Sequence, residues 1–192
     1  FDVSARTVAT QSLNIFGDHS DVYACRQTGF AMLAETNPQE VMDLSPVAHL
    51  AAIEGKVPFI NFFDGFRTSH EIQKIEKWDY ADLKEMCNMD AVKAFREHAL
   101  NPEHPAMRGS HENGDVFFQH REACNSVYEA LPAVVKKYMG KINEKLGTNY
   151  DLFNYYGAED ADRVIIAMGS ICDVAEEVID YLTAKGEKVG LI

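Results

Sequence analysis

The sequence lacks the patterns that would place it in several large functional classes. Its four cysteines, Cys25, Cys87, Cys124 and Cys172, are widely separated, so no closely spaced pair indicates a zinc or iron–sulfur site. We expect free thiols in a reducing compartment. No apolar run approaches the roughly 20 residues that a membrane-spanning helix needs, so a soluble chain is expected.

Basic residues are also scarce. The chain has 18 lysine and arginine residues against 30 aspartate and glutamate residues, which gives a formal net charge of −12 at pH 7. Nucleic acids and anionic membranes are bound mainly through clustered positive charge, so neither is an expected partner. A small anionic substrate is still compatible with this composition where one arginine is suitably placed.

Chain length and composition indicate an ordinary folded chain. With 192 residues, of which 46% are hydrophobic and 25% charged, one domain or slightly more is expected. The chain begins at Phe1 without a methionine, and residues 188–192 at its end resemble a strand that is cut short. We therefore expect an internal fragment of a longer protein, with any targeting signal missing.

A helix followed by a buried strand is the clearest local pattern. Asn37 is a suitable N-cap, Pro38 suits the first turn, and apolar residues recur at helical spacing until Gly55. Residues 57–63 follow directly and are apolar on both faces apart from Asn61, as expected of a strand between two layers of helices. The short connection between helix and strand predicts a parallel α/β fold.

Further helices are predicted over residues 80–86, 91–100 and 128–146 from their apolar spacing. The stretch 101–115 between them is rich in Pro, Gly, Asn and His and lacks apolar periodicity. It therefore predicts a loop or an arm on the surface.

A second unit begins at Asp162. Residues 163–170 predict a strand and turn, 174–184 a helix and 188–192 another strand, which together form the start of a βαβ unit. Gly169 opens the turn, but the second and third glycines of the dinucleotide-binding motif are missing. A dinucleotide site is therefore not expected there.

The end of the predicted strand 57–63 is the first candidate site. Asp64, Arg67, Ser69 and His70 follow it closely, at the edge of the sheet where α/β proteins bind ligands, and they offer an acid–base cluster. Asp-Gly is also a strong turn signal, and the following Thr-Ser-x-Glu is a capping pattern for whatever follows. From spacing alone, the structural interpretation is favoured over the catalytic one.

The second candidate site is the glycine-started stretch 17–29, which contains Asp18, His19 and Asp21. Three metal ligands within four residues rarely converge without partners from elsewhere in the chain. A turn explains these residues equally well, and a substrate or cofactor loop is favoured over a metal site.

Several motifs in one register resemble the pyruvate:ferredoxin oxidoreductase (pyruvate synthase) family. They are VSAR at 3–6, IFGDHSD at 15–21, RQTGFAML at 26–33, VAHL at 47–50, FFDGFRTSHEIQKI at 62–75 and NPEHP at 101–105. The resemblance covers all 192 residues. It implies that residues 1–150 belong to a thiamine-diphosphate-binding domain of the pyrimidine type, with a surface arm near 101–127. Residues 151–192 would then begin a domain like the C-terminal domain of transketolase.

The resemblance implies an enzyme that oxidatively decarboxylates pyruvate with coenzyme A to acetyl-CoA and carbon dioxide. Electrons would leave singly through 4Fe-4S clusters to ferredoxin or flavodoxin, and the enzyme would depend on thiamine diphosphate and magnesium. A homodimer is implied, located in the cytoplasm or, in an anaerobic protist, in a hydrogenosome or similar organelle.

Within the chain, the resemblance assigns one functional position. The family's arginine that binds the pyruvate carboxylate matches Arg6, and a planar guanidinium can hold a carboxylate through two parallel hydrogen bonds. The family's glutamate that activates the aminopyrimidine and its substrate-binding threonine would precede Phe1. The ligands of the diphosphate, magnesium and clusters would follow Ile192, so the fragment alone is expected to be inactive.

Other functions stay open at this point. A hydrolase using His19 or His70 would need a nucleophile or a metal, and the sequence has neither a G-x-S-x-G elbow nor an H-E-x-x-H helix. A non-catalytic interaction domain fits the acidic composition and the arm. Within the family, an NADP-linked enzyme or one acting on another 2-oxoacid is the closest alternative.

Overall fold

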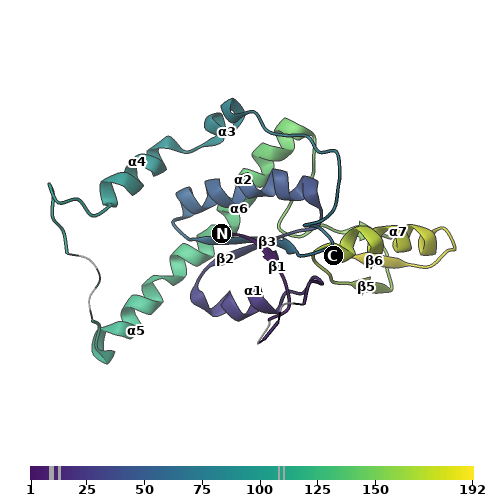
Figure 1. Cartoon of the computed structure of the whole chain (residues 1–192), viewed down its shortest axis with the longest axis horizontal. Coiled ribbons are helices and arrows are strands. Elements are labelled where there is room, and N and C mark those ends of the chain that lie inside the picture. The colour runs from purple at the N-terminus through teal and green to yellow at the C-terminus, as the bar shows by residue number, and fades with distance from the viewer. Residues whose placement is uncertain (9–10, 13, 108, 110) are drawn as a thin grey trace.

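The structure is a computed structural model that describes the whole chain except residues 9, 10, 13, 108 and 110. The described strands form two separate three-stranded sheets with helices packed against them. The predicted α/β class is therefore confirmed. In Figure 1 the first sheet lies at the centre of the molecule, and the second lies near the C-terminus.

The first sheet is parallel, with strand order β1-β3-β2. Its strands are β1 (Asp2–Ala5), β2 (Ala31–Glu35) and β3 (Phe59–Asp64). Since the three strands run in the same direction, all of them end at one edge, called the carboxyl edge below. The strand predicted at 57–63 is the central one, whereas β1 and β2 were not predicted.

Both faces of β3 are buried, as its apolar sequence predicts. Phe59 packs into a core shared with the helices on one face, while Ile60 and Phe62 pack on the other face with Val22. Val22 belongs to α1 (Ser20–Cys25), which together with a short 3₁₀ helix connects β1 to β2. The alternation follows from the two-residue period of a strand between two layers.

The predicted helix after Asn37 is α2 (Pro38–Gly55). The Asn37 side-chain oxygen accepts hydrogen bonds from the backbone N–H groups of Gln39 and Glu40, both at 3.1 Å. After the helix, Lys56 adopts a left-handed conformation with φ 56°. The N-cap and the end predicted from sequence are both confirmed.

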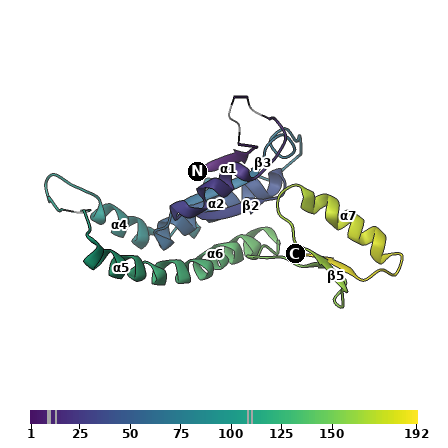
Figure 2. The same cartoon turned by 90° about the horizontal axis from the view of Figure 1, so that it is seen from below.

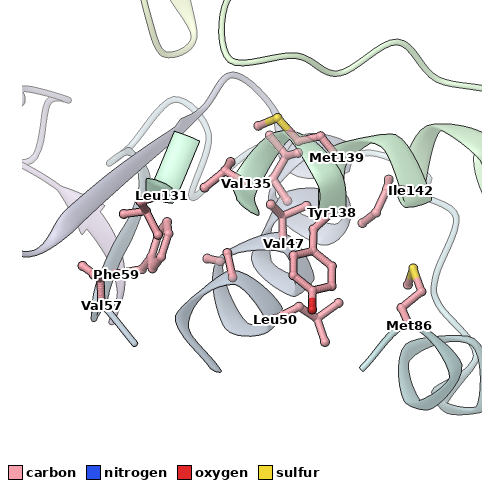
Figure 3. Close-up of a cluster of buried hydrophobic side chains, with 13 residues drawn as sticks. Val47, Leu50, Val57, Phe59, Met86, Leu131, Val135, Tyr138, Met139 and Ile142 are labelled. Atoms are coloured by element: carbon pink, nitrogen blue, oxygen red, sulfur yellow. The ribbon is translucent and has the colours of Figure 1, made fainter. Parts of the chain in front are cut away.

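The main core lies between α2 and α6 (Asn125–Leu146), together with one face of β3. Figure 3 shows Tyr138 of α6 beside Val47 and Leu50 of α2, and Leu131 of α6 beside Phe59 of β3. Tyr138 is fully buried there, and its hydroxyl donates a hydrogen bond of 2.6 Å to Glu54. The polar tip of the largest core side chain is therefore satisfied.

Three shorter helices lie between β3 and α6: α3 (Tyr80–Met86), α4 (Met89–His98) and α5 (Gly114–Ala123). In Figure 2 α4, α5 and the first turns of α6 extend away from the first sheet as an arm. The helices predicted at 80–86 and 91–100 are confirmed. None of the helices that the structure describes is both long and apolar enough to cross a membrane.

One expectation about the arm is corrected by the structure. The loop predicted at 101–115 ends earlier, because helix α5 begins at Gly114. The N–H groups of Val116 and Phe117 both bond to the carbonyl of Asn113 at 3.1 Å, which starts the helix. The Pro- and Gly-rich residues before it hid this start. Every described residue in 101–127 is exposed except the half-buried Glu112.

The second sheet has the order β4-β6-β5. Its strands are β4 (Tyr156–Gly157), β5 (Arg163–Ile165) and β6 (Val189–Leu191). β5 and β6 are parallel and are connected through α7 (Ile171–Thr183), which is the predicted βαβ arrangement. Strand β4, which pairs antiparallel with β6, was not predicted.

The two consecutive phenylalanines of β3 should differ in their contribution to stability. Phe62 is only 4% exposed and belongs to the second core cluster, whereas Phe63 is half-buried beside a groove along α2. Phe62→Ala should lower the free energy of unfolding by about 3–5 kcal/mol, and Phe63→Ala by clearly less. Urea unfolding of the two variants measures this difference. Equal losses would show that β3 is not buried in this register.

Candidate functional site

Arg6 directly follows β1 and lies at the carboxyl edge. Its backbone pairs with Gly17, and its N–H donates to the Asp21 carboxylate at 2.9 Å. Its side chain passes closely over Gly65, where a Cβ would lie 2.6 Å from Arg6 Cγ and closer still to Nε. The glycine after β3 is therefore needed for the path of the arginine side chain.

The Arg6 guanidinium is partly buried and weakly engaged. Its Nη2 donates one long hydrogen bond of 3.4 Å to Ser69 Oγ, and its buried Nε meets no acceptor in the described part of the chain. None of the ion pairs among the described residues includes Arg6. A planar cation with unused donors can bind a carboxylate through two parallel hydrogen bonds.

The turn after β3 does not form the acid–base cluster considered from the sequence. Ser69 Oγ accepts from the Phe66 N–H and contacts His70 Nδ1, both at 2.9 Å, while Asp64 bonds to Ser170 and, at 3.5 Å, to the Thr68 hydroxyl. Arg67, Ser69 and His70 are all exposed. The favoured interpretation as a turn is confirmed, but the capping prediction is wrong, because no helix begins until α3.

The stretch with Asp18, His19 and Asp21 forms a turn and the start of α1. Asp18 accepts the Ser20 N–H at 2.6 Å, and hydrogen bonds from Ser20 hold the pKa of the Asp18 carboxyl below its usual value. Asp21 accepts the N–H groups of Arg6 and Val22. Within the described residues, no group of three His, Cys, Asp or Glu side chains could hold a metal ion.

Asp64 connects two distant parts of the chain. It is 6% exposed, and its carboxylate accepts the Ser170 N–H at 2.6 Å and the Ser170 hydroxyl at 2.7 Å. Ser170 precedes α7, so the start of the second unit is attached to the carboxyl edge of the first sheet. Sequence reasoning missed this contact, because nothing in a sequence relates residues 106 positions apart.

Glu35, the last residue of β2, is a second group that sequence reasoning missed. It is fully buried, and neither its carboxyl oxygens nor Asn61 Oδ1 has a hydrogen-bond partner among the described residues. Burial raises the pKa of Glu35 to about 9, against a smaller lowering by the Asn61 amide. With a pKa of about 9, the Glu35 carboxyl is neutral near pH 7.

The raised pKa of Glu35 predicts how stability depends on pH. The pKa of this carboxyl is about 4.5 in the unfolded chain and about 9 in the folded one, so the contribution of Glu35 to stability is complete below pH 4.5 and is lost as pH rises through 9. Glu35→Gln removes this loss. Between pH 5 and 9, the free energy of unfolding of Glu35→Gln should rise relative to that of the unsubstituted chain by up to about 1.4 kcal/mol per pH unit.

Urea unfolding at a series of pH values measures this gain. Glu177→Gln, which changes an exposed glutamate of α7, is the matched control and should follow the unsubstituted chain. A constant difference between Glu35→Gln and the unsubstituted chain from pH 5 to 9 would refute a neutral Glu35.

Comparison with known proteins adds to this geometry. Residues 1–140 match the family described as pyruvate flavodoxin/ferredoxin oxidoreductase, thiamine diP-bdg. Over 192 residues the chain is 62% identical to the pyruvate-flavodoxin oxidoreductase of Enterobacter agglomerans and 56% identical to the pyruvate:ferredoxin oxidoreductase of Moorella thermoacetica. All of this chain is covered in both alignments, but only 16% of either relative.

A third relative has a name that implies a different electron acceptor. The chain is 51% identical over 193 positions to the pyruvate dehydrogenase [NADP(+)] of Cryptosporidium parvum. That alignment covers 100% of this chain and 10% of the relative. The similarity therefore extends over the whole chain but over a small part of each relative.

Proposed function

The chain belongs to the pyruvate flavodoxin/ferredoxin oxidoreductase family, and we propose that it forms part of a thiamine diphosphate-dependent pyruvate oxidoreductase. In this reaction pyruvate and coenzyme A yield acetyl-CoA, carbon dioxide and electrons, which pass through 4Fe-4S clusters to flavodoxin or ferredoxin. The family match and the names of the relatives support the proposal. A homodimer is part of it.

The observation that carries the proposal is the partly buried Arg6 guanidinium, which has no acidic partner among the described residues. We assign it to the pyruvate carboxylate. Two parallel hydrogen bonds orient the substrate, and the positive charge holds a carboxylate that would otherwise bind water. Ser69 Oγ accepts one long hydrogen bond of 3.4 Å from Nη2, which leaves the other donors of the guanidinium for the substrate.

The described residues of this chain do not supply an evident set of ligands for the cofactors. The described residues offer no cluster of three side chains for magnesium, and the four cysteines are free and far apart in sequence. We therefore derive no step through the cofactors and assign the ligands of the diphosphate, magnesium and clusters to other parts of an enzyme of the relatives' length. Bound thiamine diphosphate would supply the carbanion chemistry of decarboxylation.

We place the boundary between the two domains at residues 150 and 151. Tyr150 packs against the core of the first unit, and its hydroxyl donates to Asp43 of α2 at 2.9 Å. The second sheet begins at β4, shortly after it. A domain of the pyrimidine-binding type for 1–150 and the start of one like the transketolase C-terminal domain for 151–192 agree with these contacts.

A chimera tests the function. The 192 residues of this chain replace the stretch they match in the Enterobacter agglomerans enzyme, at 62% identity. The chimera should reduce flavodoxin with pyruvate and coenzyme A, whereas the chain alone should not. A folded chimera with bound thiamine diphosphate and intact clusters that does not turn over pyruvate would contradict the proposal.

Arg6→Ala in the chimera tests the substrate contact. A charge-assisted hydrogen bond contributes about 1.5–3 kcal/mol, and a two-bond contact more, so kcat/KM for pyruvate should fall roughly a hundredfold or more. Arg6→Lys should recover only part of this, because an ammonium cannot reproduce the planar contact. Cofactor content should not change.

Steady-state kinetics with increasing pyruvate gives these values. Arg67→Ala is the matched control, because Arg67 is exposed in the turn that Arg6 crosses. It should stay within a few-fold of the unsubstituted chimera. If Arg6→Ala and Arg67→Ala behave alike, Arg6 does not bind the carboxylate.

An NADP-linked enzyme is the second candidate, favoured by the relative from Cryptosporidium parvum. The carboxylate-binding role of Arg6 would be the same in both, because the electron acceptor is not part of that contact. Assays with NADP and with flavodoxin on the full-length protein separate the two candidates. A further assay with longer 2-oxoacids tests whether pyruvate is the preferred substrate.

A further inference from the structure

The carboxyl edge is packed too closely around Asp64 for any further side chain. A Cβ placed on Gly17 would lie 2.9 Å from Asp64 Cβ, and one placed on Gly169 would lie 2.9 Å from Asp64 Oδ1. The two glycines come from different segments, one after β1 and one before α7. Gly169 has φ 83°, a conformation that other residues adopt only with strain.

The Asp64 carboxylate bonds the segment before α7 with both of its oxygens. Oδ1 accepts the Ser170 N–H at 2.6 Å, and Oδ2 accepts the Ser170 hydroxyl at 2.7 Å. Two charge-assisted bonds to one residue restrict both the distance and the orientation of the second unit. The negative charge also lies at the positive end of the α7 dipole, which favours the contact.

Arg6 lies on the other side of the same turn. Gly65, the neighbour of Asp64, donates its N–H to the Ala5 carbonyl at 2.7 Å and lies directly against the Arg6 side chain. A shift of Asp64 therefore moves the surface on which Arg6 rests. His19 completes the packing, because its ring lies edge-on to Phe62 and close to Gly169.

We propose that Asp64 is a positioning residue: by binding Ser170 it holds the turn after β3 in the place where Arg6 can bind the substrate carboxylate. This inference rests on the proposed function of Arg6. It gives the attachment of the second unit a role in substrate binding as well as in folding. Asp64 itself does not touch the substrate.

A double-mutant cycle in the chimera tests this role. Asp64→Ala should raise KM for pyruvate about tenfold and leave KM for coenzyme A and the thiamine diphosphate content unchanged. Added to Arg6→Ala, it should raise KM for pyruvate no further, because the group that it positions is then missing. If Asp64 had a purely structural role, the increases in KM from the two substitutions would multiply in the double variant.

Two further variants keep the test decisive if Asp64→Ala does not fold. Asp64→Asn keeps an acceptor for the Ser170 N–H and a polar contact with its hydroxyl, so KM for pyruvate should return to within a few-fold of the unsubstituted value. Ser170→Ala removes one of the two bonds and should give an intermediate KM, again without effect beside Arg6→Ala.

The outcomes separate the two proposals. If Arg6→Ala raises KM for pyruvate but Asp64→Ala and Ser170→Ala do not, the positioning role is wrong and the role of Arg6 stands. The positioning role is also wrong if the increase in KM from Asp64→Ala or Ser170→Ala multiplies with the increase from Arg6→Ala. If Arg6→Ala leaves kcat/KM for pyruvate unchanged, both proposals fail.

Discussion

Strand β3 is buried on both faces, and this burial fixes the arrangement of the elements around it. Phe59 joins the core with α2 and α6, while Ile60 and Phe62 join the core on the opposite face. The strand can then pair only through its two edges, and β1 and β2 occupy both of them in parallel. This pairing brings the ends of all three strands to one edge and places Arg6 beside Gly65.

The three ionisable side chains at this edge have different surroundings. Asp64 accepts two hydrogen bonds from Ser170 and a longer one from Thr68, and Glu35 is kept neutral by burial. The Arg6 guanidinium, in contrast, retains unused donors within the described residues. An edge that satisfies or neutralises its acids but leaves its arginine available is suited to an anionic substrate, although the whole chain carries a formal net charge of −12.

Local signals made part of the fold predictable. The cap at Asn37, the apolar period of α2 and the apolar run of β3 each lie within a short stretch, so the sequence indicates them directly. β1 and β2 are short and of mixed polarity, and they become strands through pairing with β3. The family resemblance pointed to Arg6, but spacing alone could not, since one arginine after a short apolar stretch has no distinctive pattern.

The α/β class, the central strand, the main helices and the family can all be read from the amino-acid sequence. Which side chains meet depends on the folded chain: Asp64 bonds to Ser170 and not to His70, and the Arg6 side chain lies across Gly65. The difference comes from the range of the interactions. Caps and periodicity act within a few residues, whereas strand pairing and buried polar contacts join segments whose separation along the chain carries no signal.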